Sequence, residues 1–460
     1  MQSHAVNTDA VWRSEGAPLS QVIFLRTLFR ALDQFNVRYC VLHSWEGLPH
    51  ELLNDLDLAV HPRDVKLLRL AFGALYKKGY RPIQLVHYAI RAYHFDFVWY
   101  EGSVIRSAGV DVAYGSVSGR FPPMSGSAWV AGRRRQADYW IAAPDIEFAY
   151  ILAKKTLKGN LPARQGERLR QLVDEVGRAR AEKIVRGLFG ARYQKPVVDA
   201  CRDRSFGMLL SKLKPELWYT TLKRNPLNLL YFLLANTLRF AQRWLRPTGV
   251  AVVILGPDGI GKSTLVTQLS KVFTPIFARH KLYHLRPEFL VPLNKAALRI
   301  TDPYAKPVRG CLQSTVRLFG LLLDFWLGRL FRIRPELARS HLIMFDRHFQ
   351  DLTVDPLRYR YGGPAWLPRL LAHFIAAPDV IFLLDADVRT ILSRKKEMDI
   401  EQLQHLRRGY KQLMSRCANV RLIDATQKVE QITEEASRVL VCHLTERFQR
   451  QYSRWLACQE

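Results

Sequence analysis

The stretch from Gly256 to Thr264 constrains the fold of this chain more than any other part of its sequence. It reads Gly-Pro-Asp-Gly-Ile-Gly-Lys-Ser-Thr and follows an apolar, β-branched run at residues 249–255. Apolar residues then recur at helical spacing over residues 265–273, so the pattern predicts a strand, a loop and a helix in that order. Glycines let such a loop wrap its own backbone N–H groups around phosphate oxygens, so we expect it to bind the phosphates of a nucleotide.

The side chains of this loop have separate expected roles. Lys262 is expected to reach the terminal phosphates of the nucleotide, and the Ser263 hydroxyl to ligate Mg²⁺. A chance glycine turn between a strand and a helix is the alternative, but the fixed spacing and the flanking pattern favour a nucleotide site. We therefore expect ATP and Mg²⁺ as cofactors. The expected nucleotide-binding residues are Gly256, Asp258, Gly259, Gly261, Lys262, Ser263 and Thr264.

Length and charge limit the number of domains and the kinds of partner that this chain can have. With 460 residues, the chain is too long for one ordinary core, so two or three domains are expected. The formal net charge of +28 attracts polyanions, anionic membrane surfaces and phosphorylated substrates without distinguishing them. The arginines are scattered, with one tight run at residues 133–135, which favours solvated helix faces over a nucleic-acid-binding stripe. The six cysteines lie far apart and without metal-ligand spacing, which is typical of free thiols in a reducing cytoplasm.

Three segments bear on localisation. Residues 1–20 lack a continuous apolar core, so we do not expect a secretory signal and predict a cytoplasmic protein. Residues 227–245 and 318–331 are strongly apolar, but charged residues interrupt each run before the roughly 20 residues that a membrane span requires. We interpret both as buried or interfacial helices. The first is basic at its end, so peripheral membrane contact is a further hypothesis.

Carboxylates at alternate positions mark the first half of the chain. Asp55 and Asp57 lie in a strand-like run, so their side chains point to the same face. Two adjacent carboxylates repel each other unless a cation lies between them, which suits Mg²⁺. Asp111, in a second strand-like run, is the expected third carboxylate, and Asp96 competes with it for this role. We expect Asp55, Asp57 and Asp111 to bind metal; the exposed face of an edge strand is the alternative.

This arrangement of acids resembles the polymerase-β-type nucleotidyltransferase fold. In that fold a turn precedes an Asp-x-Asp strand, and a later strand supplies the third carboxylate. The resemblance covers about residues 37–114 and implies an α+β nucleotidyltransferase-like domain at residues 21–140. It departs at the turn, where His43 and Ser44 stand in place of the usual Gly-Ser, and a Cβ there takes space that triphosphate needs.

The middle of the chain is predicted to be helical. Residues 141–225 are basic and periodic, so we expect a helical extension of the first domain, with no chemistry-bearing group. Residues 226–247 are expected to form a connector helix that ends at the Arg-Pro-Thr-Gly sequence of residues 246–249. The second domain is then expected at residues 248–460.

Two further strand-like runs in this second domain end in charged residues. Asp346, Arg347 and His348 end an apolar run, and an acid at the end of a strand beside the loop would hold Mg²⁺ near Ser263. The planar guanidinium of Arg347 matches a phosphate group. Arg286 ends a shorter run and is expected to face the ligand crevice, where it would bind the acceptor; a surface arginine before a turn is the alternative.

Three motifs together resemble thymidylate kinase and related nucleoside-monophosphate kinases. They are the glycine-rich loop, the Asp346-Arg347-His348 triplet and the strand that ends at Asp385-Ala386-Asp387, and they cover about residues 249–441. The resemblance implies an α/β fold in which helices flank a parallel sheet. It also implies that Asp258 contacts an acceptor hydroxyl and that Arg347 contacts the acceptor phosphate.

The same resemblance implies a mobile lid at residues 388–410. Position 260 in the loop is Ile, so an arginine that stabilises the transferring phosphoryl group is expected from the lid, and Arg394 is the first candidate. A solvated helix end is the alternative reading of that arginine. The expected catalytic residues are Lys262, Asp346, Arg347 and Arg394.

The region where the acceptor should bind departs from thymidylate kinase. Residues 351–363 are rich in arginine and tyrosine, and the apolar run at 319–331 is also unlike that family. Arg358 and Arg360 therefore join the candidates for acceptor binding. We expect an ATP- and Mg²⁺-dependent phosphotransferase that acts on a nucleoside monophosphate or another small phosphorylated or hydroxylated acceptor. The alternatives are a nucleotidyltransferase at the Asp-x-Asp site and a nucleotide-regulated adaptor on membrane or nucleic acid.

Overall fold

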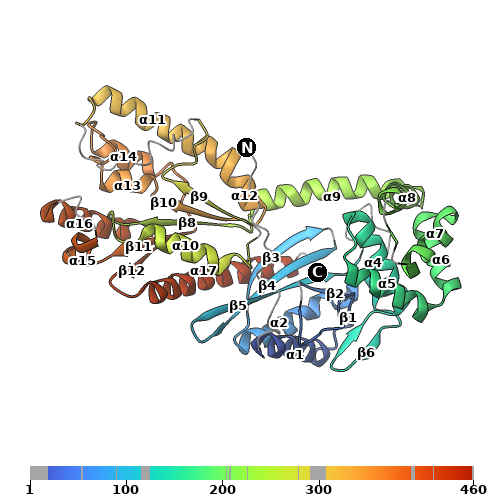
Figure 1. Ribbon diagram of the computed structural model, residues 1–460. Helices are drawn as coiled ribbons and strands as arrows, with labels where there is room; N and C mark the ends of the chain where they lie inside the picture. The colour runs from blue at the N-terminus through green and yellow to red at the C-terminus, as the bar shows by residue number, and fades with distance from the viewer. Residues whose placement is uncertain are drawn as a thin grey trace. The chain divides into compact units, whose positions relative to one another are not determined.

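The structure is a computed structural model in which the chain divides into two compact units (Figure 1). The first contains residues 1–239 and 448–460, and the second contains residues 240–447. The residues that the structure describes are 19–52, 55–89, 91–115, 125–203, 205–206, 209–224, 226–277, 279–290, 307–394, 399–417 and 419–457.

The first unit is built on a seven-stranded mixed sheet with the strand order β3-β4-β5-β2-β1-β7-β6. The strands are β1 (Tyr39–Val41), β2 (Leu56–Val60), β3 (Arg81–Ala89), β4 (Ala92–Glu101), β5 (Val104–Ala113), β6 (Arg134–Gln136) and β7 (Tyr139–Ile141). Parallel pairing of β2 with β5 aligns Asp57 with Asp111, and antiparallel pairing of β5 with β4 aligns Asp111 with His94. The sheet therefore brings these three polar side chains into one row.

Helices of the first unit form two apolar clusters with this sheet. One contains Phe24 and Phe29 of α1 together with Phe95 and Phe97 of β4. The other lies among the helices from α4 to α8 and includes Phe148. The helices are α1 (Leu19–Gln34), α2 (Leu68–Lys77), α3 (Gly126–Val130), α4 (Pro144–Lys158), α5 (Ala163–Val176), α6 (Arg178–Phe189), α7 (Gln194–Asp203) and α8 (Leu209–Arg224).

The ends of two long helices define the division of the chain. Helix α9 (Pro226–Leu245) passes from the first unit to the second at residues 239–240. Helix α17 (Val429–Ala457) ends in the first unit, where Phe448 and Tyr452 join the aromatic cluster around Phe95. The chain thus divides within α9, and the aromatic packing of Phe448 and Tyr452 places the end of α17 in the first unit.

The second unit contains a five-stranded, wholly parallel sheet with the order β12-β11-β8-β10-β9. The strands are β8 (Val250–Leu255), β9 (His280–His284), β10 (Leu342–Asp346), β11 (Val380–Asp385) and β12 (Val420–Asp424). Every residue of the central β8 is buried, as expected for a strand covered on both faces. Helices α10 and α17 lie on one side of the sheet and α11 to α14 on the other (Figure 1). The predicted α/β class is confirmed.

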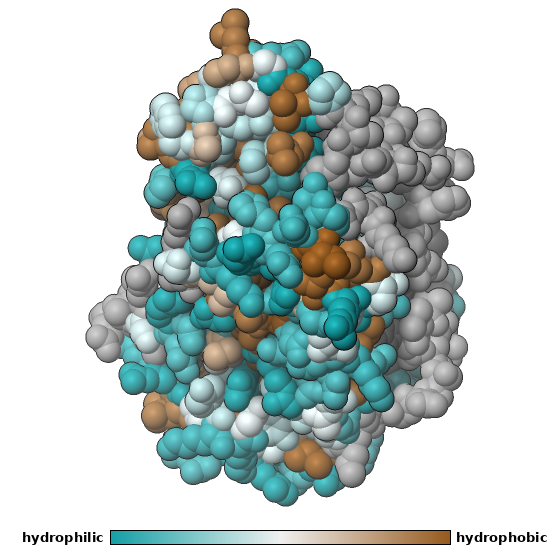
Figure 2. Space-filling model, turned by 90° about the vertical axis from the view of Figure 1, so that its left-hand side faces the viewer, coloured by the Kyte–Doolittle hydropathy of each residue, from teal (hydrophilic) through white to brown (hydrophobic). Residues whose placement is uncertain are grey.

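The helices of the second unit differ in how much of their apolar surface they bury. In α11, Leu322 and Phe325 are buried, whereas Leu312 is 79% exposed. Figure 2 shows brown, hydrophobic side chains at its top, where Figure 1 has the N-terminal end of α11. The helices are α10 (Lys262–Phe273), α11 (Cys311–Gly328), α12 (Arg334–Ala338), α13 (Phe349–Val354), α14 (Trp366–Ala372), α15 (Val388–Arg394) and α16 (Ile400–Arg416).

The two apolar stretches marked in the sequence thus occur as α9 and α11. Leu227 and Leu238 of α9 are more than two-thirds exposed, at 72% and 71%. Among the described residues, no helix combines the length and the apolar character that crossing a bilayer would require. Peripheral membrane contact through α9 stays a hypothesis.

Candidate active site

The glycine-rich loop joins the end of β8 to the start of α10, as predicted. Gly256 has a positive φ of 143°, and a Cβ at this position would lie 2.8 Å from the backbone oxygen of Leu384. Gly261 also has a positive φ, 108°, immediately before Lys262 begins the helix. Glycine is required at such positions because side chains disfavour this backbone region. The loop therefore directs its backbone toward the N-terminus of α10, where anions bind.

Lys262 lies inside this loop. Its ammonium group donates to the carbonyl oxygens of Gly256 at 2.9 Å and Pro257 at 2.7 Å, and it lies 3.3 Å from an oxygen of Asp258. Burial and the charge of nearby Arg347 lower the pKa of Lys262. The cation is thus held at the position where phosphate oxygens are expected.

The expected metal ligands of the loop region meet across neighbouring strands. β8 and β10 are paired in parallel, and the Ser263 hydroxyl donates to Oδ2 of Asp346 at 3.3 Å. Burial alone would raise the pKa of Asp346, but a hydrogen bond from His284 and the charge of Lys262 outweigh it and lower the pKa. Oδ1 of Asp346 is buried without a hydrogen-bond partner in the described part of the chain. An ionised carboxylate with an unused oxygen beside a hydroxyl fits Mg²⁺.

Asp258 contacts two arginine side chains on the other side of the loop. Its two carboxylate oxygens accept hydrogen bonds from Arg347 and Arg358. Burial opposes ionisation, but the charges of Lys262, Arg347 and Arg358 hold the pKa of Asp258 well below its usual value. The structure thereby brings three predicted acceptor-binding residues into contact.

A second carboxylate, which was not among the predicted site residues, orients Arg347. Asp351 is fully buried and accepts from Nη1 of Arg347 at 2.7 Å, from the Tyr359 hydroxyl at 2.6 Å and from the Tyr410 hydroxyl. Arg347 itself has a positive φ of 77° and is 4% exposed. The signal available in the sequence was an acid, Asp351, four residues after Arg347.

Part of this chain is similar to thymidylate kinases. The thymidylate kinase of Blochmanniella pennsylvanica is 28% identical over 209 residues, which cover 41% of this chain and 93% of that kinase. The thymidylate kinase of Shewanella frigidimarina is 28% identical over 217 residues, covering 43% of this chain and 95% of that kinase. The second unit is a thymidylate kinase-like P-loop kinase region. The resemblance inferred from the three motifs is confirmed, and the region is a phosphotransferase.

No protein-family model matches the chain. The solved structure of thymidylate kinase from Candida albicans aligns with a TM-score of 0.33 at 16% identity, covering 43% of this chain and 93% of that one. The corresponding structure from Ehrlichia chaffeensis aligns with a TM-score of 0.33 at 18% identity, covering 42% and 98%.

The arginine that was expected from a lid lies beside the loop. Arg394 ends α15, and its Nη1 lies 3.3 Å from the backbone oxygen of Ile260. It lines a cavity of about 330 Å³ together with Gly261 and Thr264. Residues 395–398 of the predicted lid lie outside the described residues. Arg407, also in the predicted lid, instead pairs with Asp385 at 2.7 Å.

The remaining acceptor candidates occupy different positions. Arg360 donates to the backbone oxygen of Pro307 at 2.9 Å, so its side chain is used in loop packing while Arg358 contacts Asp258. Arg286 is half-buried and follows β9. Arg358 is joined to the loop by its hydrogen bond to Asp258.

The acids of the first unit line a cleft of about 280 Å³. Asp57 is not free there: Lys154 lies 2.8 Å from its Oδ1 and His43 lies 3.0 Å from its Oδ2. Burial would raise the pKa of Asp57, but Lys154 and His43 hold it far below the usual value. Other polar residues lining the cleft are Ser44, Asp55, Asp111, Lys155, Lys158 and Gln165.

One group in this cleft and one beside it were missing from the predicted site residues. Lys154, Lys155 and Lys158 come from α4, in the region where no chemistry-bearing group was expected. His94 was also missed; it lies between Asp111 at 2.8 Å and Asp96 at 3.1 Å. Burial would lower the pKa of His94, but hydrogen bonds to these carboxylates outweigh it and raise the pKa to about 11.

Proposed function

We propose that the second unit transfers the γ-phosphoryl group of ATP to a nucleoside monophosphate or another small phosphorylated or hydroxylated acceptor. One observation carries the proposal: Lys262, Asp346 and the Asp258–Arg347 pair converge on one glycine-rich loop. The curated relatives are thymidylate kinases, so dTMP is the first acceptor to test.

The residues around the expected ATP phosphates would act mainly by positioning those phosphates and neutralising their charge. Lys262 and Arg394 would neutralise negative charge on the phosphate oxygens as the γ-phosphoryl group moves. Ser263 and Asp346 are the residues that would hold Mg²⁺, which supplies positive charge to the same oxygens when bound. Oδ1 of Asp346, which has no hydrogen-bond partner among the described residues, supports this assignment.

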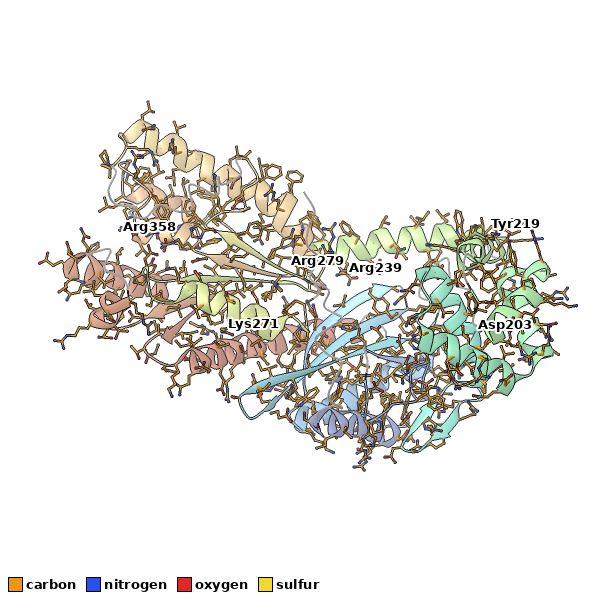
Figure 3. All side chains as sticks on the ribbon, viewed as in Figure 1. Asp203, Tyr219, Arg239, Lys271, Arg279 and Arg358 are labelled. Carbon is orange, nitrogen blue, oxygen red and sulfur yellow. The ribbon has the colours of Figure 1, made fainter. Side chains whose placement is uncertain are left out.

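The acceptor side would use Arg347 and Arg358 together. The guanidinium groups of Arg347 and Arg358 both donate to the Asp258 carboxylate. An acceptor phosphate has the negative charge and the oxygen geometry to bind the same two groups. Asp258 would then be available to accept a hydrogen bond from an acceptor hydroxyl. Arg358 lies in the segment that departs from thymidylate kinase (Figure 3), so the acceptor preference of this chain depends on that segment.

The test is a transfer assay with γ-labelled ATP and a panel of acceptors. The panel contains dTMP, the other nucleoside monophosphates, and sugar and polyol phosphates, and the initial rate of label transfer is measured for each. Transfer to at least one phosphorylated acceptor is expected. No transfer to any of them, with salt-sensitive binding to anionic vesicles in its place, would favour a nucleotide-regulated adaptor.

A second candidate function concerns the first unit, where carboxylates and lysines share one cleft. We propose that this cleft binds a nucleoside triphosphate, with the lysines of α4 facing its phosphates. The group transferred is the nucleotidyl group, which contains the α-phosphate. An α-labelled nucleotide separates the two candidates, because label transfer with release of pyrophosphate is expected from this cleft alone. Asp111→Asn should abolish that transfer and leave γ-phosphoryl transfer unchanged.

A further inference from the structure

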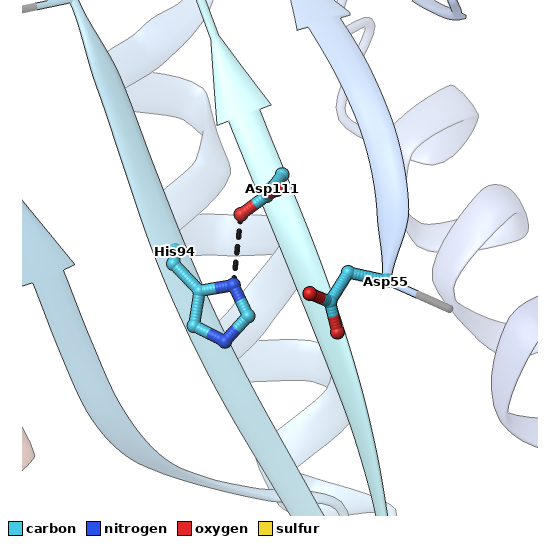
Figure 4. A group of neighbouring side chains, drawn as sticks. All are labelled: Asp55, His94 and Asp111. Carbon is cyan, nitrogen blue, oxygen red and sulfur yellow. Dashed lines mark hydrogen bonds and ion pairs between the residues drawn. The ribbon is translucent and has the colours of Figure 1, made fainter. Parts of the chain in front are cut away.

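Three side chains in the first unit converge on one point. Asp55 immediately precedes β2, Asp111 lies on β5 and His94 lies on β4, which are neighbouring strands of the sheet (Figure 4). Each offers one ligand atom, and these atoms all lie within 4.8 Å of one another. The convergence follows from strand register, because Asp111 is aligned with His94 on one side and with Asp57 on the other. Asp55, two residues before Asp57, lies on the same face.

The chemistry of these ligand atoms selects a class of metal ion. An imidazole nitrogen with two carboxylate oxygens suits divalent first-row transition metals, whereas Mg²⁺ and Ca²⁺ prefer oxygen ligands throughout. Asp57, which the sequence analysis placed in the metal site, has both oxygens engaged by Lys154 and His43. The ligand set therefore differs from the expected group of three carboxylates.

The surroundings of His94 supply a second, independent argument. Its Nδ1 faces Asp111, and its Nε2 lies 3.1 Å from Oδ1 of Asp96. Asp96 is 4% exposed, and its Oδ2 is buried without a hydrogen-bond partner in the described part of the chain. A histidine that ligates a metal commonly donates its other N–H to a carboxylate, which orients the ring. Asp96 is in the position for that role.

Gly109 supplies a third argument. A Cβ at this position would lie 2.1 Å from Oδ1 of Asp55 and 2.8 Å from Cε1 of His94. Both distances are far shorter than real side-chain contacts, so a residue larger than glycine would displace both groups. The backbone of β5 thus leaves the space in which the carboxylate and the imidazole approach each other.

We propose that Asp55, His94 and Asp111 bind a divalent transition-metal ion, that Asp96 orients His94, and that Gly109 leaves room for the site. A bound ion takes the place of the proton between His94 and Asp111. The proposal holds whether or not the cleft transfers nucleotidyl groups, because it concerns ligand atoms and not turnover.

The probe is Co²⁺, because its visible absorption reports ligands bound directly to the ion. Full-length protein is stripped with a chelator and titrated with Co²⁺ without nucleotide. One equivalent should bind with visible absorption bands, and a tenfold excess of Mg²⁺ should not remove it. His94→Gln should weaken binding at least tenfold, whereas His50→Gln, which changes an exposed histidine of the same unit, should not.

Two further variants separate loss of the site from loss of the fold. Asp96→Asn should still bind Co²⁺, but about 10- to 100-fold more weakly and with shifted absorption bands, as expected for a positioning residue. Gly109→Ala should weaken binding without removing any ligand. For each variant, unchanged γ-phosphoryl transfer and an unchanged circular dichroism spectrum show that the chain is folded.

Three results would overturn the proposal. The first is unchanged Co²⁺ affinity in folded His94→Gln and Gly109→Ala protein. The second is displacement of Co²⁺ by an equal concentration of Mg²⁺, and the third is an intense thiolate-to-metal absorption band, which would assign the ion to a cysteine. If His94→Gln does not fold, Gly109→Ala and Asp96→Asn decide the question by themselves.

Discussion

The two polar clefts of this protein have opposite charge arrangements. In the second unit, Lys262, Arg347 and Arg358 surround one carboxylate, Asp258. In the first unit, Asp55, Asp96 and Asp111 surround one imidazole, that of His94. A group of cations attracts phosphate oxygens directly, whereas a group of carboxylates needs a cation beside it, such as a metal ion or the lysines of α4, before an anion can approach.

Buried histidines show the same contrast. His94 lies between carboxylates, which raise its pKa to about 11. His348 is buried beside Phe325 and Phe345, and burial lowers its pKa to about 4. One histidine is therefore held charged and the other neutral at the same pH. The difference shows that neighbouring groups, and not residue type, set the pKa of a buried histidine.

The strongest test of the comparison is Lys262→Ala. Removing the cation from the loop should lower γ-phosphoryl transfer about 1000-fold or more, because its charge acts where negative charge develops. Co²⁺ binding by the first unit should not change. Lys271→Ala on the exposed face of the same helix is the matched control (Figure 3), and transfer rates are measured for both. Full activity in Lys262→Ala would remove the loop from the mechanism.

The second test uses pH. The pKa of His348 lies below that of an unfolded histidine, so the unfolded chain binds the proton first, and stability is lost as pH falls from about 6.5 toward 4. When the pH falls from about 7.5 to about 4.5, the free energy of unfolding should drop in wild-type protein by roughly 2 kcal/mol more than it drops in His348→Asn. Denaturant titrations at both pH values measure the difference. Equal losses in the two proteins would show that His348 is not held neutral.

The smallest expected effect is a difference in the KM for the acceptor between variants of Arg358 and Arg360. Arg358 contacts Asp258, whereas Arg360 donates to the backbone oxygen of Pro307. Arg358→Ala should raise the KM for the acceptor about tenfold, because a charge-assisted hydrogen bond is lost. Arg360→Ala should change it by about twofold at most. Steady-state kinetics with the best acceptor measure both, and an equal effect of the two substitutions would contradict the assignment of Arg358 to the acceptor.

The kinase region shows which interactions local sequence can predict. The glycine-rich loop needs only its own backbone and the helix that follows, so Gly256 to Thr264 sufficed to predict strand, loop and helix. Asp346 could be placed near Ser263 because the carboxyl ends of parallel strands meet at one edge of a sheet. Asp351 and Tyr410 could not, because their contact joins α13 to α16, 59 residues apart.

The first unit shows the opposite case. The spacing of Asp55 and Asp57 predicted a shared face, but it could not show that Lys154, 97 residues away on α4, pairs with one of them. Nor could it show that antiparallel pairing sets His94 beside Asp111. A period of two residues determines which face a side chain occupies, whereas the register of the next strand determines its neighbour.

The sequence by itself determined the phosphate loop, the parallel kinase fold and the residues at the ends of its strands, because these depend on backbone conformation and apolar periodicity over short segments. Only the tertiary structure decided which charges meet: Arg358 and not Arg360 contacts Asp258, and His94 brings a ligand atom within 4.8 Å of those of Asp55 and Asp111. Electrostatic interactions fall off with distance and depend on burial, so they follow from packing that no local pattern records.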